Sequence, residues 1–164
     1  MEQFAAWVEA IGTIIAAIAE TPSFRWSLSQ MENLMLWGNV LQATGNGLLA
    51  DLNPPGSKNQ IGNIIQSSGN STIVASLLFD VTKSQEQLLT VQGNQLQALG
   101  ASLSLVEGLE QGDIISIYSN ALQAKGNILQ AEGAKRNRKD WSLAGSWIQA
   151  TGATLAAIYV TPNE

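Results

Sequence analysis

Small and apolar residues recur along this chain at intervals of three, four and seven positions, which is the spacing of a helix face and not of a strand. A five-residue pattern carries this spacing: an aliphatic residue, Gln or Glu, Ala or Ser, any residue, and Gly. Its copies close at Gly12, Gly45, Gly69, Gly100, Gly126, Gly133 and Gly152. A further small residue stands seven positions earlier, at Ala5, Gly38, Gly62, Gly93, Ser119, Gly126 and Gly145. On a helix these positions form one stripe with the aliphatic residue, and the Gln lies at its edge.

Breaks that contain proline, glycine or polar residues divide the chain into six predicted helices. Their spans are 2–20, 26–52, 57–79, 84–110, 113–136 and 140–160. We expect capping boxes at Ser27–Gln30, Ser57–Gln60 and Ser84–Gln87. Short connections make consecutive helices antiparallel. The predicted fold is all-α: one domain over residues 1–164, an antiparallel six-helix bundle built from degenerate Gly/Ala-rich repeats.

The repeated glycines predict close helix packing. Each glycine inside a helix costs about 1 kcal/mol relative to alanine, so many of them need an offsetting interaction. Without side chains, two helix backbones can approach closely and gain dispersion contacts. The Gln beside each groove can then hydrogen-bond to a neighbouring helix. The alternative is that the glycines are relics of duplication. Duplication is also evident at the ends, where Trp7–Gly12 and Thr21-Pro22 match Trp147–Gly152 and Thr161-Pro162 at a constant offset.

Composition removes several kinds of chemistry. The 164 residues include no Cys and no His, which excludes disulfides, cysteine nucleophiles, Ser-His-Asp triads and most transition-metal sites. A net charge of -5 argues against a nucleic-acid partner. Only 13% of residues are charged, and Gln and Asn supply the polarity. We therefore expect a polar, weakly charged surface suited to self-association.

Two apolar segments bear on localisation, Ala5–Ala19 and Trp147–Val160. Both are shorter than the roughly 20 apolar residues that span a bilayer, and no signal peptide is evident. We expect a soluble, cytoplasmic protein, with surface or spore association left open. Both segments would also suit a buried hairpin in a membrane.

Few residues are candidates for chemistry, and we expect no cofactor and no catalytic or metal-binding residue. Glu107, Glu110 and Asp113 would permit a metal or an acid–base pair, but a solvated helix end explains them better. Glu9 takes the place of Gln in the first repeat. An exposed edge position is favoured for it over a buried, partnered carboxylate.

Basic and aromatic residues have structural interpretations. The basic run of Lys135, Arg136, Arg138 and Lys139 could contact phosphates or anionic lipids, although a solvated loop is favoured. We expect the tryptophans to be core anchors rather than a ligand cage, with two of them near helix starts covering the bundle ends. They are Trp7, Trp26, Trp37, Trp141 and Trp147.

The repeated wording Gly-Asn-x-Leu-Gln-Ala-x-Gly-Asn, with Trp-Ile-Gln-Ala-Thr-Gly followed by Ala-Ala-Ile and Thr-Pro, resembles a family of short repetitive proteins of unknown function from Bacillus-type bacteria. The resemblance covers most of the chain. It implies a bacterial source and brings no activity, cofactor or catalytic residue.

The leading functional hypothesis is a non-enzymatic structural or protein–protein interaction protein, whose partner is itself or another protein. The alternative is a membrane-active bundle that forms pores or binds lipid surfaces. A small-molecule carrier has no positive trace in the sequence, and an enzyme is the least favoured interpretation.

Overall fold

Six antiparallel helices make up the protein in the computed structural model, which describes residues 1–22 and 26–159. They are α1 (Glu2–Glu20), α2 (Leu28–Leu52), α3 (Lys58–Leu78), α4 (Lys83–Gln111), α5 (Ile114–Arg136) and α6 (Lys139–Tyr159). The described residues contain no strand, so the predicted all-α six-helix bundle is confirmed. The predicted boundaries agree with the observed ones to within two residues. The predicted helix end at Val160 and the Thr161-Pro162 match lie outside the described residues.

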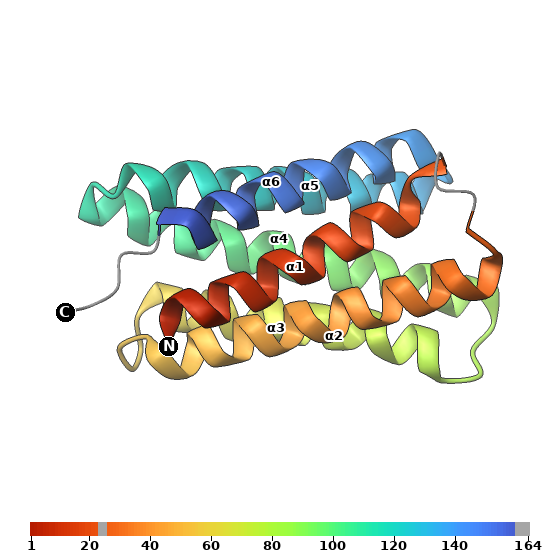
Figure 1. Ribbon diagram of the computed structural model, residues 1–164, viewed down its shortest axis with the longest axis horizontal. Helices are drawn as coiled ribbons and strands as arrows, with labels where there is room; N and C mark the ends of the chain where they lie inside the picture. Colours follow the sequence, from red (N-terminus) through yellow and green to blue (C-terminus); the bar gives the residue numbers. More distant parts are fainter. Residues whose placement is uncertain (23–25, 160–164) are drawn as a thin grey trace.

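The helices form a closed ring. Each packs against its neighbours in chain order, and α6 returns to pack against α1. One end of the ring carries Met1 and the α2–α3 and α4–α5 connections, at the left of Figure 1, and we call it the Met1 end. The other end carries the remaining three connections and is called the Glu20 end. The ring is therefore a set of three hairpins, α1–α2, α3–α4 and α5–α6, around one axis.

Local capping explains where the helices begin. Ser27–Gln30 forms the expected reciprocal capping box. In Ser57–Gln60 the Ser accepts from the backbone, but the Gln side chain bonds instead to the backbone N–H of Gly56. The third prediction is wrong: Ser84–Gln87 lies inside α4, and the box is Thr82–Gln85. Thr82 has an extended backbone conformation and its side chain accepts from the Gln85 backbone N–H, as an N-cap requires, whereas Ser84 already lies within the helix.

Glycines bring the two helices of each hairpin into backbone contact. A Cβ atom at Gly12 would lie 2.6 Å from the backbone oxygen of Gly38, and one at Gly69 would lie 2.6 Å from that of Gly93. Gly62 and Gly100 contact each other's helix in the same way, as do Gly126 and Gly145. The remaining three glycines face the backbone of the partner helix: Gly45 at Ala5–Glu9, Gly133 at Arg138–Ser142, and Gly152 at Ser119–Gln123. All eleven glycines of the stripe thus occupy helix–helix contacts, where any side chain would push the helices apart.

Large apolar side chains lie mostly on the outside of the ring. Among the described residues, the buried apolar side chains are alanines apart from Ile73. The prediction that the tryptophans anchor a core is wrong for Trp37, which is 61% exposed, and for Trp147, which is 40% exposed. Trp7 is half-buried against an alanine cluster. The physical reason is that glycine and alanine occupy the tight flanks of each helix, so bulky residues fit only on its outer side. The prediction of a polar surface is therefore only partly correct, because many large apolar side chains are exposed on it.

Candidate functional site: a polar lumen along the ring

Asparagine and glutamine fill the axis of the ring. The pattern Asn-x-x-Gln-x-x-x-Asn places three amides on one helix face. It occurs on α2 at Asn39, Gln42 and Asn46, on α3 at Asn63, Gln66 and Asn70, and on α5 at Asn120, Gln123 and Asn127. All but Asn120 of these side chains are buried. The glycine repeat alone predicts Gln at the edge of an apolar stripe and does not indicate the Asn residues, although their spacing from Gln is a signal that could have located them.

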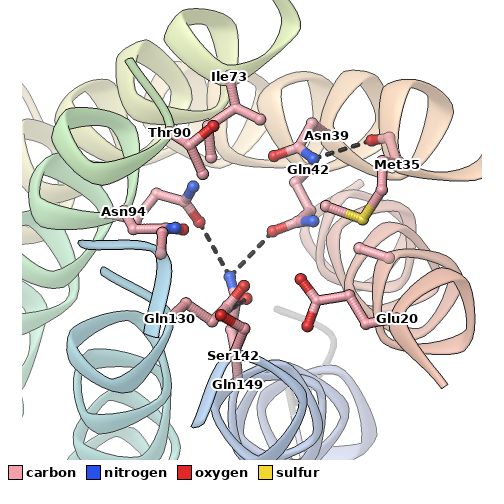
Figure 2. A pocket seen from close by; sticks show the side chains of 13 residues that line it. Glu20, Met35, Asn39, Gln42, Ile73, Thr90, Asn94, Gln130, Ser142 and Gln149 are labelled. Carbon is pink, nitrogen blue, oxygen red and sulfur yellow. Dashed lines mark hydrogen bonds between the residues drawn. The ribbon is translucent and has the colours of Figure 1, made fainter. Parts of the chain in front are cut away.

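Four glutamines close the lumen near its middle. The Gln149 amide donates to the side-chain oxygens of Gln42 at 2.9 Å and Gln97 at 3.0 Å. Its own oxygen accepts from Gln130 at 2.8 Å. Figure 2 shows this glutamine cluster, in which α6 is joined to α2, α4 and α5 across the axis. These hydrogen-bonded amides favour this arrangement of the helices over others, because any arrangement that left a buried amide without its hydrogen bond would be less stable.

Two polar chambers lie on either side of the glutamine cluster. The Glu20 chamber has a volume of about 40 Å³ and is lined by residues of all six helices, including all four clustered glutamines (Figure 2). The Glu9 chamber has a volume of about 110 Å³, is also lined by all six helices or their caps, and extends from Gln66 and Gln123 to Glu2 at the Met1 end. Each chamber is roomy enough for water or a small ion.

Glu9 carries a carboxylate into the interior. It is only 5% exposed, so the expected exposed edge position is wrong. Glu9 precedes Gly12 by three positions, as Gln66 precedes Gly69, and ring closure turns this position toward the axis. Burial raises the pKa of Glu9 to about 7, and hydrogen bonding with Asn46 opposes the shift. The first repeat therefore has a titratable oxygen where other repeats have an amide.

Glu20 is the corresponding carboxylate of the other chamber. Burial raises its pKa to about 7, against a smaller opposing effect of hydrogen bonding with Ser146. Its Oε2 atom is buried and has no hydrogen-bond partner in the described structure. In Figure 2 the carboxyl group points toward the glutamine cluster. The sequence signal was weak because Glu20 is the last residue of α1 and resembles an ordinary solvated helix end.

The pKa of Glu20 predicts a pH dependence of stability. Its ordinary value is 4.5 and its folded value is about 7, so the folded state holds the proton more tightly. The free energy of unfolding should therefore fall as the pH rises from about 4.5 to about 7, then level off. We expect Glu20→Gln to match the parent below about pH 4 and to exceed it by about 3 kcal/mol above about pH 8. Urea unfolding at several pH values measures this difference.

The pH dependence of the free energy of unfolding that remains in Glu20→Gln provides a control for that experiment. The chain has no His, and Glu9 is the other side chain with a pKa raised to about 7. Glu20→Gln should therefore retain part of the decline, and the double variant with Glu9→Gln should lose most of it. Parallel pH profiles for the parent and Glu20→Gln would contradict the assignment.

The acidic residues at the Met1 end stabilise helix ends. Glu107 is buried and accepts from the Asn59 backbone at 2.7 Å, at the N-terminus of α3. Glu110 pairs with Lys58 at 2.6 Å, and the Asp113 side chain caps α5. Glu107 therefore lies on a helix N-terminus rather than at a solvated position. No group of three or more potential metal-ligating side chains occurs in residues 1–22 and 26–159.

The basic run is partly neutralised within itself. Arg136 pairs with Glu132 at 2.7 Å, and Arg138 pairs with Asp140 at 2.7 Å. Arg138 also lies 5.0 Å from the centre of the Trp141 ring, a cation–π contact. The guanidinium beside Asp140 lowers the pKa of that carboxyl. The remaining cations of the run, Lys135 and Lys139, are exposed.

A mostly apolar surface covers one side of the ring, with exposed charged residues only toward the ends of its helices, at Glu32 and Asp51 on α2 and at Lys139 and Asp140 on α6. It consists of the outward residues of α6, α1 and α2, which lie next to one another in Figure 1. We call it the outer apolar face and define it by Phe4, Ile11, Trp37, Trp147 and Ile158, which are 40–61% exposed.

Its centre is a groove between α1 and α6, with a volume of about 390 Å³, lined by Ile14, Leu155 and their neighbours. The opposite side also exposes apolar residues, including Leu99 and Ile128, but the polar residues Lys125 and Gln95 are exposed among them on α5 and α4.

The geometry defines an all-α ring of three hairpins with an amide-filled axis and an apolar outer face. The chain belongs to a family of unknown function, DUF6944, whose model matches residues 1–157. Comparison with curated proteins and with solved structures gives no match. Within the described residues α1 has the length and composition to cross a bilayer, but half of that segment is buried in the ring, as in a core helix of a soluble protein.

Proposed function

We propose that this protein is a non-enzymatic structural protein that assembles with copies of itself through the outer apolar face. The observation that carries the proposal is the groove between α1 and α6 with exposed aromatic side chains on both sides of it. The opposite side also exposes apolar residues, such as Leu99 and Ile128, but they are interspersed with the exposed Lys125 and Gln95. An apolar patch of this kind in a soluble protein marks an interaction surface.

A second copy is the occupant that fits the face best. Each molecule carries a net charge of -5, so two copies repel each other least when they meet through a face with few charges. The three exposed aromatic side chains, with the isoleucines beside them, offer on the order of 500 Å² of apolar surface. Surrounding half-buried residues of α1 and α6 extend it toward the roughly 800 Å² per partner of a stable interface. The groove beside Ile14 can receive an aromatic side chain from the other copy.

Source and location complete the proposal. A Bacillus-type bacterial origin and the specific repetitive family are supported by the Gly-Asn-x-Leu-Gln-Ala-x-Gly wording alone. A cytoplasmic location is part of the same proposal. We assign no nucleic-acid partner, since the net charge is negative.

A charged residue in the centre of the outer apolar face tests the assembly. Ile11 is 47% exposed on α1, and Glu at this position would have to be desolvated between two copies. We expect Ile11→Glu to shift the protein to a monomer and to weaken association at least tenfold. Sedimentation velocity over a range of concentrations measures the change.

A matched variant controls for the added charge. Leu99 is 52% exposed on α4, which lies across the ring from α1. Leu99→Glu should leave the association unchanged. A parent protein that remains monomeric at every concentration would contradict the proposal, as would an equal effect of the two variants.

A second candidate function, membrane association, is favoured by the style of packing. Helices in lipid associate through small residues and interhelical hydrogen bonds, and both features occur in this ring. Cations gather at the Glu20 end, including Lys135 and Arg136. Co-sedimentation with neutral and anionic vesicles separates the two functions. Binding that Ile11→Glu abolishes and Leu99→Glu spares would assign the outer apolar face to lipid.

A further inference from the structure

The Glu9 chamber contains a negative charge without a cationic side chain to balance it. Among the residues that the structure describes, its lining includes the buried Glu9 and no Lys or Arg. Most of the other lining groups are amides and a hydroxyl, which offer oxygen atoms. A carboxylate in such a chamber must either hold a proton or be accompanied by a cation from solution.

An uncommitted oxygen atom points to the second of these states. Gln123 lines the chamber, is 3% exposed, and its Oε1 atom is buried without a hydrogen-bond partner. Buried acceptors without donors are costly, so a ligand that supplies positive charge would satisfy them.

We propose that the Glu9 chamber binds one monovalent cation, held by the Glu9 carboxylate and by amide oxygens that include Gln123. Carboxylate and amide oxygens are ligands for hard cations and acceptors for an ammonium group. A single deeply buried carboxylate neutralises one positive charge, whereas divalent ions usually take several anionic ligands. The volume of about 110 Å³ admits an alkali ion with water or a small ammonium ion.

The chamber is also placed for entry of a cation. It reaches Glu2, Asn53 and Asn59 at the Met1 end, so its lining runs from mid-ring to the helix termini. A cation can therefore reach Glu9 from solution without crossing the glutamine cluster.

Thermal unfolding in different salts tests the proposal. The chloride salts are those of sodium, potassium, ammonium, methylammonium and the bulky cation N-methylglucamine, at equal ionic strength. The pH is at least one unit above the pKa of Glu9. We expect one or more small cations to raise the Tm by several degrees over N-methylglucamine, because a ligand that binds only the folded state stabilises it. A preference for sodium or potassium identifies an alkali site, and a preference for the ammonium ions identifies a site for N–H donors.

Two variants localise the effect. Glu9→Gln introduces the amide that α3 and α5 carry at the same register, so the variant should fold and lose the cation-dependent rise. Glu20→Gln alters the other chamber and should retain it. Line broadening of the sodium-23 resonance by the folded protein, lost in Glu9→Gln, gives a readout that does not depend on unfolding. Equal Tm values in all salts, or an unchanged salt effect in Glu9→Gln, would overturn the proposal and leave a water-filled chamber.

Discussion

Gly45→Ala should destabilise the protein by about 2 kcal/mol, although alanine is the better helix former. A Cβ atom at this position would lie 2.6 Å from the Glu9 backbone nitrogen and 2.9 Å from the Ala5 backbone oxygen. These are main-chain atoms of α1, so only a displacement of the whole helix can relieve the clash. The displacement would loosen the α1–α2 hairpin along its length. Denaturant unfolding measures the loss of free energy.

Gly47→Ala is the matched comparison two residues along the same helix. Gly47 is exposed, and the nearest atom to an added Cβ is the Ser67 hydroxyl at 3.8 Å. This variant should be neutral or gain up to about 1 kcal/mol from helix propensity. The opposite signs of the two substitutions separate close packing from propensity. Two equal gains would show that the glycines are relics of duplication.

Gln149→Leu should cost about 3 kcal/mol or more, because it removes the centre of the glutamine cluster. The leucine would leave the buried oxygens of Gln42 and Gln97 without a donor. The Gln130 amide would keep only its 3.5 Å hydrogen bond to Asn127 Oδ1. Each unsatisfied group costs about 1–3 kcal/mol, and the greater hydrophobicity of leucine offsets part of the loss. The variant should also weaken the attachment of α6 to the opposite side of the ring. Hydrogen exchange of backbone amides in α6 should therefore quicken.

Gln95→Leu provides the comparison at an exposed glutamine of α4. This substitution changes the same chemical group outside the ring and should alter the free energy of unfolding by less than about 0.5 kcal/mol. If Gln149→Leu were equally mild, the glutamine cluster would contribute little, and the ring would be stabilised by backbone packing alone.

The helices were predictable from the sequence because their signals are local. Proline breaks, Ser-x-x-Gln caps and glycines at seven-residue spacing depend on residues close in the chain, and the six helices follow from them. Even the error at Ser84–Gln87 concerns one cap that shifted by two residues, to Thr82.

The inward face was not predictable from the same signals. A helical wheel gives the relative angles of Gly12, Glu9 and Trp7, but it does not say which side faces the axis. The wheel puts the Glu9 position at the edge of the small-residue stripe, which predicts an exposed carboxylate, and the apolar character of tryptophans such as Trp37 predicts that they are inside. In a closed ring each helix has two tight flanks, and the small residues take them. The amides are left for the axis and the bulky residues for the exterior.

The raised pKa values of the carboxylates on the axis of the ring could not be predicted from the sequence either. The raised pKa values of Glu9 and Glu20 arise from desolvation by helices distant in sequence. Nothing near either residue in the chain signals it. The departure of Glu9 from the Gln of the repeat was the available clue, and only the closed ring gives it chemical meaning.

Because α6 packs against α1, this ring does not need the terminal cap repeats that open helical arrays require. A solenoid of stacked repeats exposes an unpaired surface at each terminus and needs specialised polar cap repeats to stay soluble. Here the first hairpin shields the last, and every repeat is internal. The number of hairpins then determines the width of the central space. With a fourth hairpin we expect glutamine side chains to be too short to meet across the axis, so that the ring would enclose an open channel.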